Sequence, residues 1–122
     1  IEEALAGLSS AGLRLAVLSN KAHPNTVAIA EHFFPGRFEM VLGLRPEAPA
    51  KPDPAGALEI ARVFGLAPGR ILYLGDSGVD MKTAVAAGMY PVGVTWGYRS
   101  EEELKAAGAL RIINRTEEIL QI

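Results

Sequence analysis

The sequence predicts an α/β fold built on a mostly parallel sheet, and three observations support this prediction. Five short apolar runs with turn residues around them are typical of strands; they cover residues 13–18, 38–42, 71–74, 91–94 and 111–113. Segments whose apolar residues recur at helical spacing lie between these runs. The resulting alternation of strands and helices is typical of a three-layer α/β/α domain with right-handed crossovers.

Signals for the starts and ends of helices agree with this alternation. Asp53 followed by Pro54 predicts a helix start, and Gly65 lies where that helix should end. The apolar stripe of the same helix consists of Ala57, Ile60, Ala61 and Phe64. The further signals are Gly88 as the end of a helix after Asp80, Ser100 with Glu103 as a capping box, and Thr116 as another helix start.

Composition narrows the classes of protein to consider. A chain of 122 residues with 49% hydrophobic residues can build one domain with a core, so we expect a single domain over residues 1–122. The net charge of −2, with arginines and lysines scattered, argues against nucleic-acid binding, and the apolar runs are too short to span a membrane. The lack of cysteine excludes disulfides and thiolate metal sites and favours a cytoplasmic protein.

Two aspartates follow the third apolar run. The run ends at Gly75, and Asp76 and Asp80 come directly after it. Open parallel sheets bind ligands beyond the carboxyl ends of their strands, where a carboxylate suits Mg²⁺, so the pair is a candidate metal site with the Ser77 hydroxyl beside it. The alternative is an ordinary turn in which Asp76 or Asp80 caps the next helix.

Two other segments should lie at the same edge of the sheet. Ser19 and Asn20 follow the first apolar run, where a hydroxyl and free backbone N–H groups can hold phosphate oxygens. Lys51, in a proline-rich loop, can stabilise the charge on a phosphoryl group. The alternatives are a simple turn at Ser19 and Asn20 and a solvated surface lysine at position 51.

These segments, taken in order, resemble a known family. Leu18–Lys21, Lys51–Pro54 and Leu74–Asp80 are similar to the second, third and fourth motifs of the haloacid dehalogenase-like hydrolase superfamily. Val92–Ser100 is similar to its bacterial phosphoglycolate phosphatase branch. The resemblance covers essentially the whole chain and implies a Rossmann-like core, with residues 1–12 similar to the helix that follows the cap domain of that branch.

The resemblance also implies roles for the candidate residues. Ser19 would bind the phosphoryl group together with the backbone of Asn20, and Lys51 would neutralise the charge of the phosphoryl group and of the nucleophile. Asp76 would ligate Mg²⁺, while Asp80 would support the metal shell and Lys51. The implied reaction is hydrolysis of a small phosphate monoester, 2-phosphoglycolate by likeness, through an aspartyl-phosphate.

One part of the family's catalytic apparatus has no counterpart here. The family's nucleophile lies in an Asp-x-Asp motif at the end of its first strand, whereas the aspartates of this chain are Asp53, Asp76 and Asp80. We therefore expect the chain to be a partial core whose parent carries an upstream segment with that motif and the cap, and we expect the chain alone to be inactive. The strand over residues 15–18 should then not pair with the strand over residues 71–74, because the family's first strand lies between them.

Two alternatives to a phosphatase follow from the same residues. A 2-haloacid dehalogenase also has Ser-Asn after its second strand, although a metal-binding carboxylate at Asp76 favours phosphoryl chemistry. A non-catalytic remnant or interaction module of the same fold is consistent with the missing nucleophile, whereas the intact set of Ser19, Lys51, Asp76 and Asp80 favours an enzyme.

Overall fold

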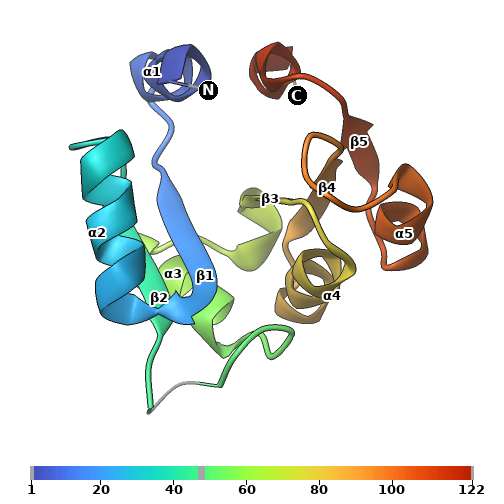
Figure 1. The fold of residues 1–122 in the computed structure, drawn as a ribbon, viewed down its shortest axis with the longest axis horizontal. Helices are drawn as coiled ribbons and strands as arrows, with labels where there is room; N and C mark the ends of the chain where they lie inside the picture. The colour runs from blue at the N-terminus through green and yellow to red at the C-terminus, as the bar shows by residue number, and fades with distance from the viewer. Residues whose placement is uncertain (1, 47–48, 122) are drawn as a thin grey trace.

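A computed structural model describes residues 2–46 and 49–121 (Figure 1). The part of the proline-rich loop at positions 47–48 lies outside the described residues, as do positions 1 and 122. In chain order the elements are α1 (Glu2–Ser10), β1 (Ala16–Ala22), α2 (His23–Phe33), β2 (Met40–Leu44), α3 (Ala55–Phe64), the 3₁₀ helix η1 (Pro68–Arg70), β3 (Leu72–Gly75), α4 (Gly78–Ala87), β4 (Tyr90–Val94), α5 (Glu101–Ala106), β5 (Arg111–Ile113) and the 3₁₀ helix η2 (Thr116–Gln121).

The strands form two parallel sheets. β1 pairs with β2 in one sheet, and the other has the order β3-β4-β5. The predicted α/β class and the parallel pairing are therefore confirmed. β1 and β3 are not hydrogen-bonded neighbours, as expected, and each is the edge strand of its own sheet (Figure 1).

The first strand extends further than its apolar run. The prediction ended this strand at residue 18, whereas β1 continues to Ala22, which pairs with Leu44 after an irregularity in the register beyond Leu18. Ser19 and Asn20 thus lie within β1 rather than after it. The discrepancy arises because hydrophobicity reports burial, whereas the backbone stays extended beyond the apolar run and pairs again at Ala22, which is exposed.

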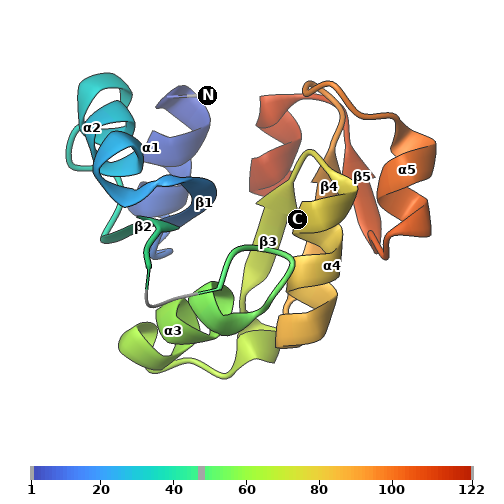
Figure 2. The ribbon, with the colours of Figure 1, turned by 60° about the horizontal axis from the view of Figure 1, so that its bottom comes forward.

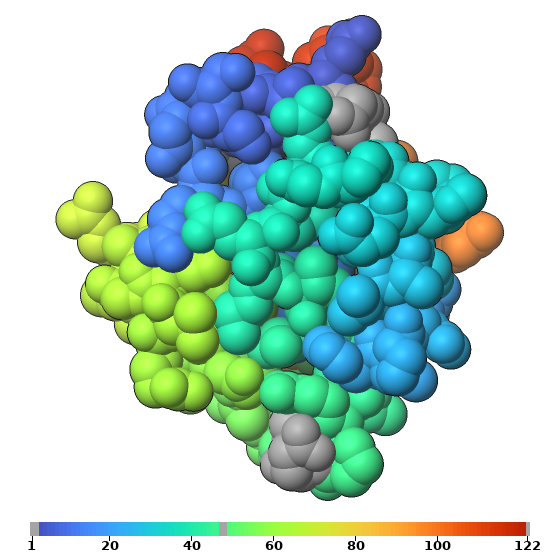
Figure 3. All heavy atoms as spheres, turned by 90° about the vertical axis from the view of Figure 1, so that its left-hand side faces the viewer, coloured from blue at the N-terminus to red at the C-terminus, as the bar shows by residue number. Residues whose placement is uncertain are grey.

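The helices pack against both sheets and between them. α2 contacts β1 and β2, α4 contacts β3 and β4, and α3 contacts both β1 and α4. In the space-filling view from the side of α2, α2 and α3 flank β2 (Figure 3). α1 contacts η2, which brings the two ends of the described chain together (Figure 2). Along the described residues, no helix has the length and apolarity required to cross a bilayer.

Two buried clusters stabilise this arrangement. One joins α1 to the three-stranded sheet and η2; its buried members are Ala4, Val92, Val94, Ile113 and Ile119. The other joins α3 to α4 and consists of Ala57, Ala61, Ala84, Ala87 and Met89. Alanines dominate this second cluster, so the two helices approach closely, and α3 fixes the end of the proline-rich loop beside α4.

Most of the predicted helix ends are confirmed. Gly65 and Gly88 both adopt left-handed conformations after α3 and α4, with φ of 67° and 77°. The Ser100 hydroxyl accepts from the Glu103 N–H at 3.1 Å. Asp53 is not the N-cap of α3, which is Pro54, but its carboxylate still accepts from the Ala55 N–H at 2.9 Å.

Candidate phosphate and metal site

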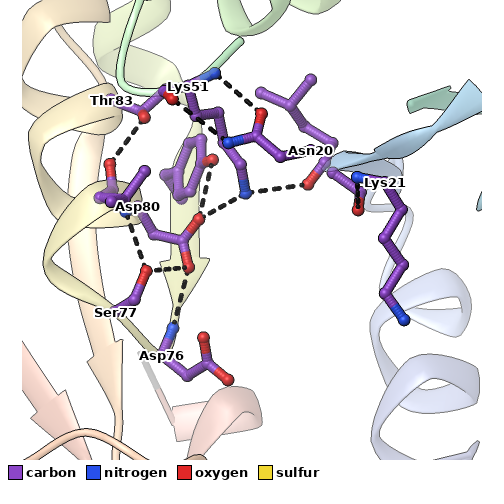
Figure 4. A network of polar contacts seen from close by, with 11 residues as sticks. Asn20, Lys21, Lys51, Asp76, Ser77, Asp80 and Thr83 are labelled. Atoms are coloured by element: carbon purple, nitrogen blue, oxygen red, sulfur yellow. Dashed lines mark hydrogen bonds and ion pairs between the residues drawn. The ribbon is translucent and has the colours of Figure 1, made fainter. Parts of the chain in front are cut away.

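Lys51 links the two sheets at the edge where the predicted site residues meet. Its ammonium Nζ lies 2.6 Å from Asp80 Oδ1, at the start of α4, and 3.4 Å from the Leu18 carbonyl oxygen of β1 (Figure 4). The side chains of Lys51 and Asp80 are only 13% and 11% exposed. Lys51 is therefore not a solvated surface lysine, and the sequence prediction that its loop approaches the aspartates is confirmed.

The Asp80 carboxylate accepts hydrogen bonds on both oxygens. Oδ1 receives the Lys51 ammonium and the Tyr73 hydroxyl, the latter at 3.5 Å, and Oδ2 receives the Asp76 N–H and the Ser77 hydroxyl, each at 3.2 Å. Gly75 allows this approach because a Cβ at that position would collide with the Asp80 side chain. The arrangement suits the predicted role of Asp80 in supporting Lys51.

Neither aspartate caps α4. The N-cap is Ser77, whose hydroxyl accepts from the Asp80 N–H at 3.3 Å, so the alternative in which Asp76 or Asp80 caps this helix is wrong. The Ser77 hydroxyl donates in turn to Asp80. This reciprocal pair fixes the turn between β3 and α4, and with it the position of Asp76.

Asp76 is the exposed carboxylate of the site. Among residues 2–46 and 49–121, no hydrogen bond or ion pair engages its side-chain oxygens, in contrast to those of Asp80 (Figure 4). The backbone of the following loop lies close by, since a Cβ on Gly97 would come within 2.5 Å of Asp76 Oδ2. A free carboxylate that shares this edge with a lysine fits Mg²⁺, which takes one or two carboxylates together with water and phosphate oxygens.

The described residues do not hold a complete metal cage. No group of three or more His, Asp or Glu side chains within residues 2–46 and 49–121 converges as a metal site. A magnesium ion at Asp76 would therefore need oxygen ligands from water, substrate or further residues. Mg²⁺ commonly keeps several waters and relies on substrate phosphate, so this ligand set suits a magnesium-dependent phosphoryl site.

Ser19 and Asn20 lie opposite the aspartates on β1. The Ser19 hydroxyl accepts from the Lys21 N–H at 3.1 Å, and Ser19 is half-buried. The Asn20 carboxamide contacts the backbone of Lys51, with distances of 2.9 Å from the Lys51 N to Oδ1 and 3.2 Å from Nδ2 to the Lys51 O. Both residues share the edge with Lys51, and their predicted contacts with phosphate stay predictions.

Two residues that sequence reasoning missed complete the surroundings of the site. The Tyr73 hydroxyl contacts Asp80, and burial, with the negative charge of Asp80 as the next cause, raises the pKa of Tyr73 above its usual value. Glu103 of α5 accepts from the Gly78 N–H at 3.1 Å and so holds the first turn of α4. Glu103 is recognisable in the sequence as part of a capping box, but nothing there points to Gly78.

Comparisons with known sequences show which protein family this chain resembles. A family model described as haloacid dehalogenase-like hydrolase matches residues 1–88. The phosphoglycolate phosphatase of Pectobacterium atrosepticum is 30% identical over 123 residues, which cover 100% of this chain and 53% of that protein. The phosphoglycolate phosphatase of Escherichia coli K12 is 33% identical over 105 residues, which cover 85% of this chain and 42% of that protein.

Solved structures extend the likeness to the fold. A Lactobacillus delbrueckii protein, provisionally named a phosphoglycolate phosphatase, superposes with a TM-score of 0.94 and 33% identity over 99% of this chain and 51% of its own. A predicted phosphoglycolate phosphatase from Haemophilus somnus has a TM-score of 0.89 and 32% identity over 98% of this chain and 53% of its own. The chain spans about half the length of these relatives, and it belongs to the haloacid dehalogenase-like hydrolases.

Proposed function

We propose that this chain is part of the catalytic core of a Mg²⁺-dependent phosphatase that hydrolyses a small phosphate monoester. The observation that carries the proposal is the position of Lys51, whose buried ammonium bridges β1 and Asp80 beside the free carboxylate of Asp76. Phosphoryl transfer requires stabilisation of the negative charge on the transferred group. The fixed ammonium of Lys51 and a metal ion on the Asp76 carboxylate would both supply it.

Each residue has a separate task in this proposal. The Lys51 ammonium attracts the phosphoryl oxygens and holds them in place, while Asp80 orients that ammonium. The Ser19 hydroxyl of β1 donates a hydrogen bond to a phosphoryl oxygen. Asp76 would hold the magnesium ion, which supplies charge neutralisation for the phosphoryl group when it is bound. Ser77 keeps the turn that presents Asp76.

The nucleophile lies outside this chain in our proposal. The aspartates within residues 2–46 and 49–121 are Asp53, Asp76 and Asp80; Asp53 bonds the start of α3, and the other two occupy the site as described. Relatives are about twice as long, so an upstream segment of the parent protein can supply an Asp-x-Asp carboxylate that forms an aspartyl-phosphate. The names of these relatives favour 2-phosphoglycolate as the substrate.

Release of phosphate from 2-phosphoglycolate tests the proposal. The parent protein should release phosphate in the presence of Mg²⁺ and lose this activity with EDTA or with Asp76→Asn. Asp53→Asn is the matched control, because Asp53 bonds the start of α3, and this variant should remain active. The 122-residue chain alone should release none. Turnover by this chain alone would show that its nucleophile lies within these residues.

The other two functions make different predictions. A 2-haloacid dehalogenase would release halide from a 2-haloacid without a metal, and the free Asp76 carboxylate gives no reason for that chemistry. A non-catalytic module of this fold would leave the parent protein without phosphatase activity towards any small phosphate ester. A metal-dependent release of phosphate by the parent protein would exclude both.

A further inference from the structure

The side chain of Asn20 makes a pair of hydrogen bonds with the backbone of one distant residue, Lys51. Its Oδ1 accepts from the Lys51 N–H at 2.9 Å and its Nδ2 donates to the Lys51 carbonyl oxygen at 3.2 Å (Figure 4). One side-chain amide thus engages both backbone groups of one residue that lies 31 positions away in the sequence. The geometry resembles the paired bonds that two residues exchange across an antiparallel sheet.

Within positions 49–54 of the loop that carries Lys51, the hydrogen bonds of residues other than Lys51 stay inside the loop or reach α3. Pro49 and Ala50 are exposed, and a turn bond from the Asp53 N–H to the Ala50 carbonyl lies within the loop itself. On the side of β1, the contacts of Lys51 come from Asn20, which holds its backbone, and from the Leu18 carbonyl, which accepts from its ammonium. β1 therefore fixes both ends of this lysine.

We call the two hydrogen bonds from the Asn20 side-chain amide to the backbone of Lys51 the clamp. The clamp matters because lysine has a long and flexible side chain. Holding the lysine side chain in a single rotamer costs up to about 2 kcal/mol of conformational entropy. This cost rises when the backbone that carries the side chain also moves. Fixing the backbone leaves the ion pair with Asp80 to order the side chain alone. A displacement of about 1 Å in a catalytic group can lower a rate strongly, so the clamp has a direct bearing on phosphoryl transfer.

We propose that Asn20 is a positioning residue that acts on phosphoryl chemistry through Lys51, by fixing the backbone of that lysine with its side-chain amide. The catalytic part of this statement rests on the proposed phosphatase function, whereas the clamp itself does not. Asn20 then differs from Ser19, its half-buried neighbour on β1, whose proposed role is a direct hydrogen bond to the substrate.

Chemical labelling of lysines tests the clamp without any assay of activity. The polypeptide that carries this chain is treated briefly with acetic anhydride, and peptide mass spectrometry gives the labelling rate of Lys51 relative to that of the exposed Lys82. Asn20→Ala should raise this ratio at least about fivefold, because the variant removes both hydrogen bonds and the loss of one bond of about 1 kcal/mol already corresponds to that factor. Asn114→Ala is the matched control, because it removes an amide that accepts from Thr95 and not from Lys51.

The outcomes separate the clamp from a general loosening of the fold. An unchanged Lys51 ratio in Asn20→Ala, or an equal rise in Asn114→Ala, would overturn the proposal. A measurement on the unsubstituted protein does not depend on a variant that folds: the Lys51 amide should exchange its hydrogen slowly, because it donates to Asn20. Rapid exchange at this amide would also overturn the proposal.

A kinetic measurement on the parent protein then tests the catalytic part. Asn20→Ala should lower kcat for 2-phosphoglycolate by about the factor seen in labelling, with a smaller change in KM, because the lysine is misplaced while Ser19 remains. An increase in KM with kcat unchanged would assign Asn20 to the substrate instead and overturn the positioning role. A parent protein without phosphatase activity would refute the proposed function, while the labelling ratio would still decide the clamp.

Discussion

At the scale of single residues, Lys51 and Asp80 bring opposite charges together with little contact with water. Removing one partner of a buried ion pair leaves the other charge desolvated and unpaired, which is more costly than the pair was favourable. We expect Asp80→Asn to lower the free energy of unfolding by about 3 kcal/mol, measured by urea denaturation.

An exposed ion pair provides the control for this substitution. Glu39 bonds Arg14 at 2.9 Å, with side chains 50% and 44% exposed, so water screens both charges. Glu39→Gln should cost less than about 1 kcal/mol. Equal losses of unfolding free energy in Asp80→Asn and Glu39→Gln would show that burial of the Lys51–Asp80 pair does not affect stability.

Tyr73 links the same site to stability at alkaline pH. Burial raises the pKa of Tyr73 in the folded protein above the ordinary value of 10.0, so the folded state keeps a proton that the unfolded chain loses. The stabilisation is therefore complete below pH 10 and declines as the pH rises further, by at most about 1.4 kcal/mol per pH unit.

Tyr73→Phe should remove this contribution to the pH dependence. Urea denaturation at pH 8, 10 and 11 should show a smaller loss of stability above pH 10 in Tyr73→Phe than in the unsubstituted protein. Tyr98→Phe is the control, since the Tyr98 side chain is fully exposed, and it should leave the pH dependence unchanged. If the free energy of unfolding fell equally with pH in Tyr73→Phe and in the unsubstituted protein, the contribution of Tyr73 to the pH dependence would be contradicted.

At the scale of elements, α5 holds the start of α4 through Glu103. The carboxylate reaches the Gly78 N–H, one of the first amides of α4 that has no partner within its own helix. A negative charge at this position also interacts favourably with the helix dipole. The turn that carries Asp76 is thus supported by a helix that follows it in the chain.

Glu103→Ala should destabilise the protein by about 1 kcal/mol, and thermal denaturation should show a lowered Tm. Glu102→Ala, one position earlier on α5, is the matched control, because Glu102 is exposed and does not reach Gly78. Hydrogen exchange at the Gly78 amide should accelerate in Glu103→Ala alone. An unaltered Gly78 amide in that variant would contradict the role of Glu103.

At the scale of the whole molecule, the two sheets are joined by side chains and helices rather than by strand pairing. Within residues 2–46 and 49–121, β1 and β3 are both edge strands, and each has one row of backbone groups without a strand partner. The contacts that join the two sheets include the packing of α3 on α4 and the contacts of Lys51.

The upstream segment that we propose for a longer parent protein should protect these two edges. We expect amides of β1 and β3 to exchange hydrogen much more slowly in a polypeptide that includes this proposed segment than in the 122-residue chain. β5, which is an edge strand at the far side of its sheet, serves as the internal reference and should change little. Equal changes in β3 and β5 would argue against a strand that enters between the sheets.

Local patterns in the sequence predicted the parts of this protein that depend on neighbouring residues. The alternation of strands and helices, the glycines at 65 and 88 and the cap at Ser100 depend on burial periodicity and backbone geometry within a few positions. The resemblance of three ordered segments predicted the family, and the aspartates of the chain predicted that the nucleophile lies elsewhere.

The tertiary structure decided which side chains meet. The clamp of Asn20 on Lys51, the contact of Tyr73 with Asp80 and the bond of Glu103 to Gly78 all join separate elements. The resemblance predicted a role for the backbone of Asn20 in phosphate binding, which stays a prediction, and no local pattern indicated the contact of its side chain with Lys51. That contact depends on how the proline-rich loop docks against β1, which packing between elements distant in the chain determines.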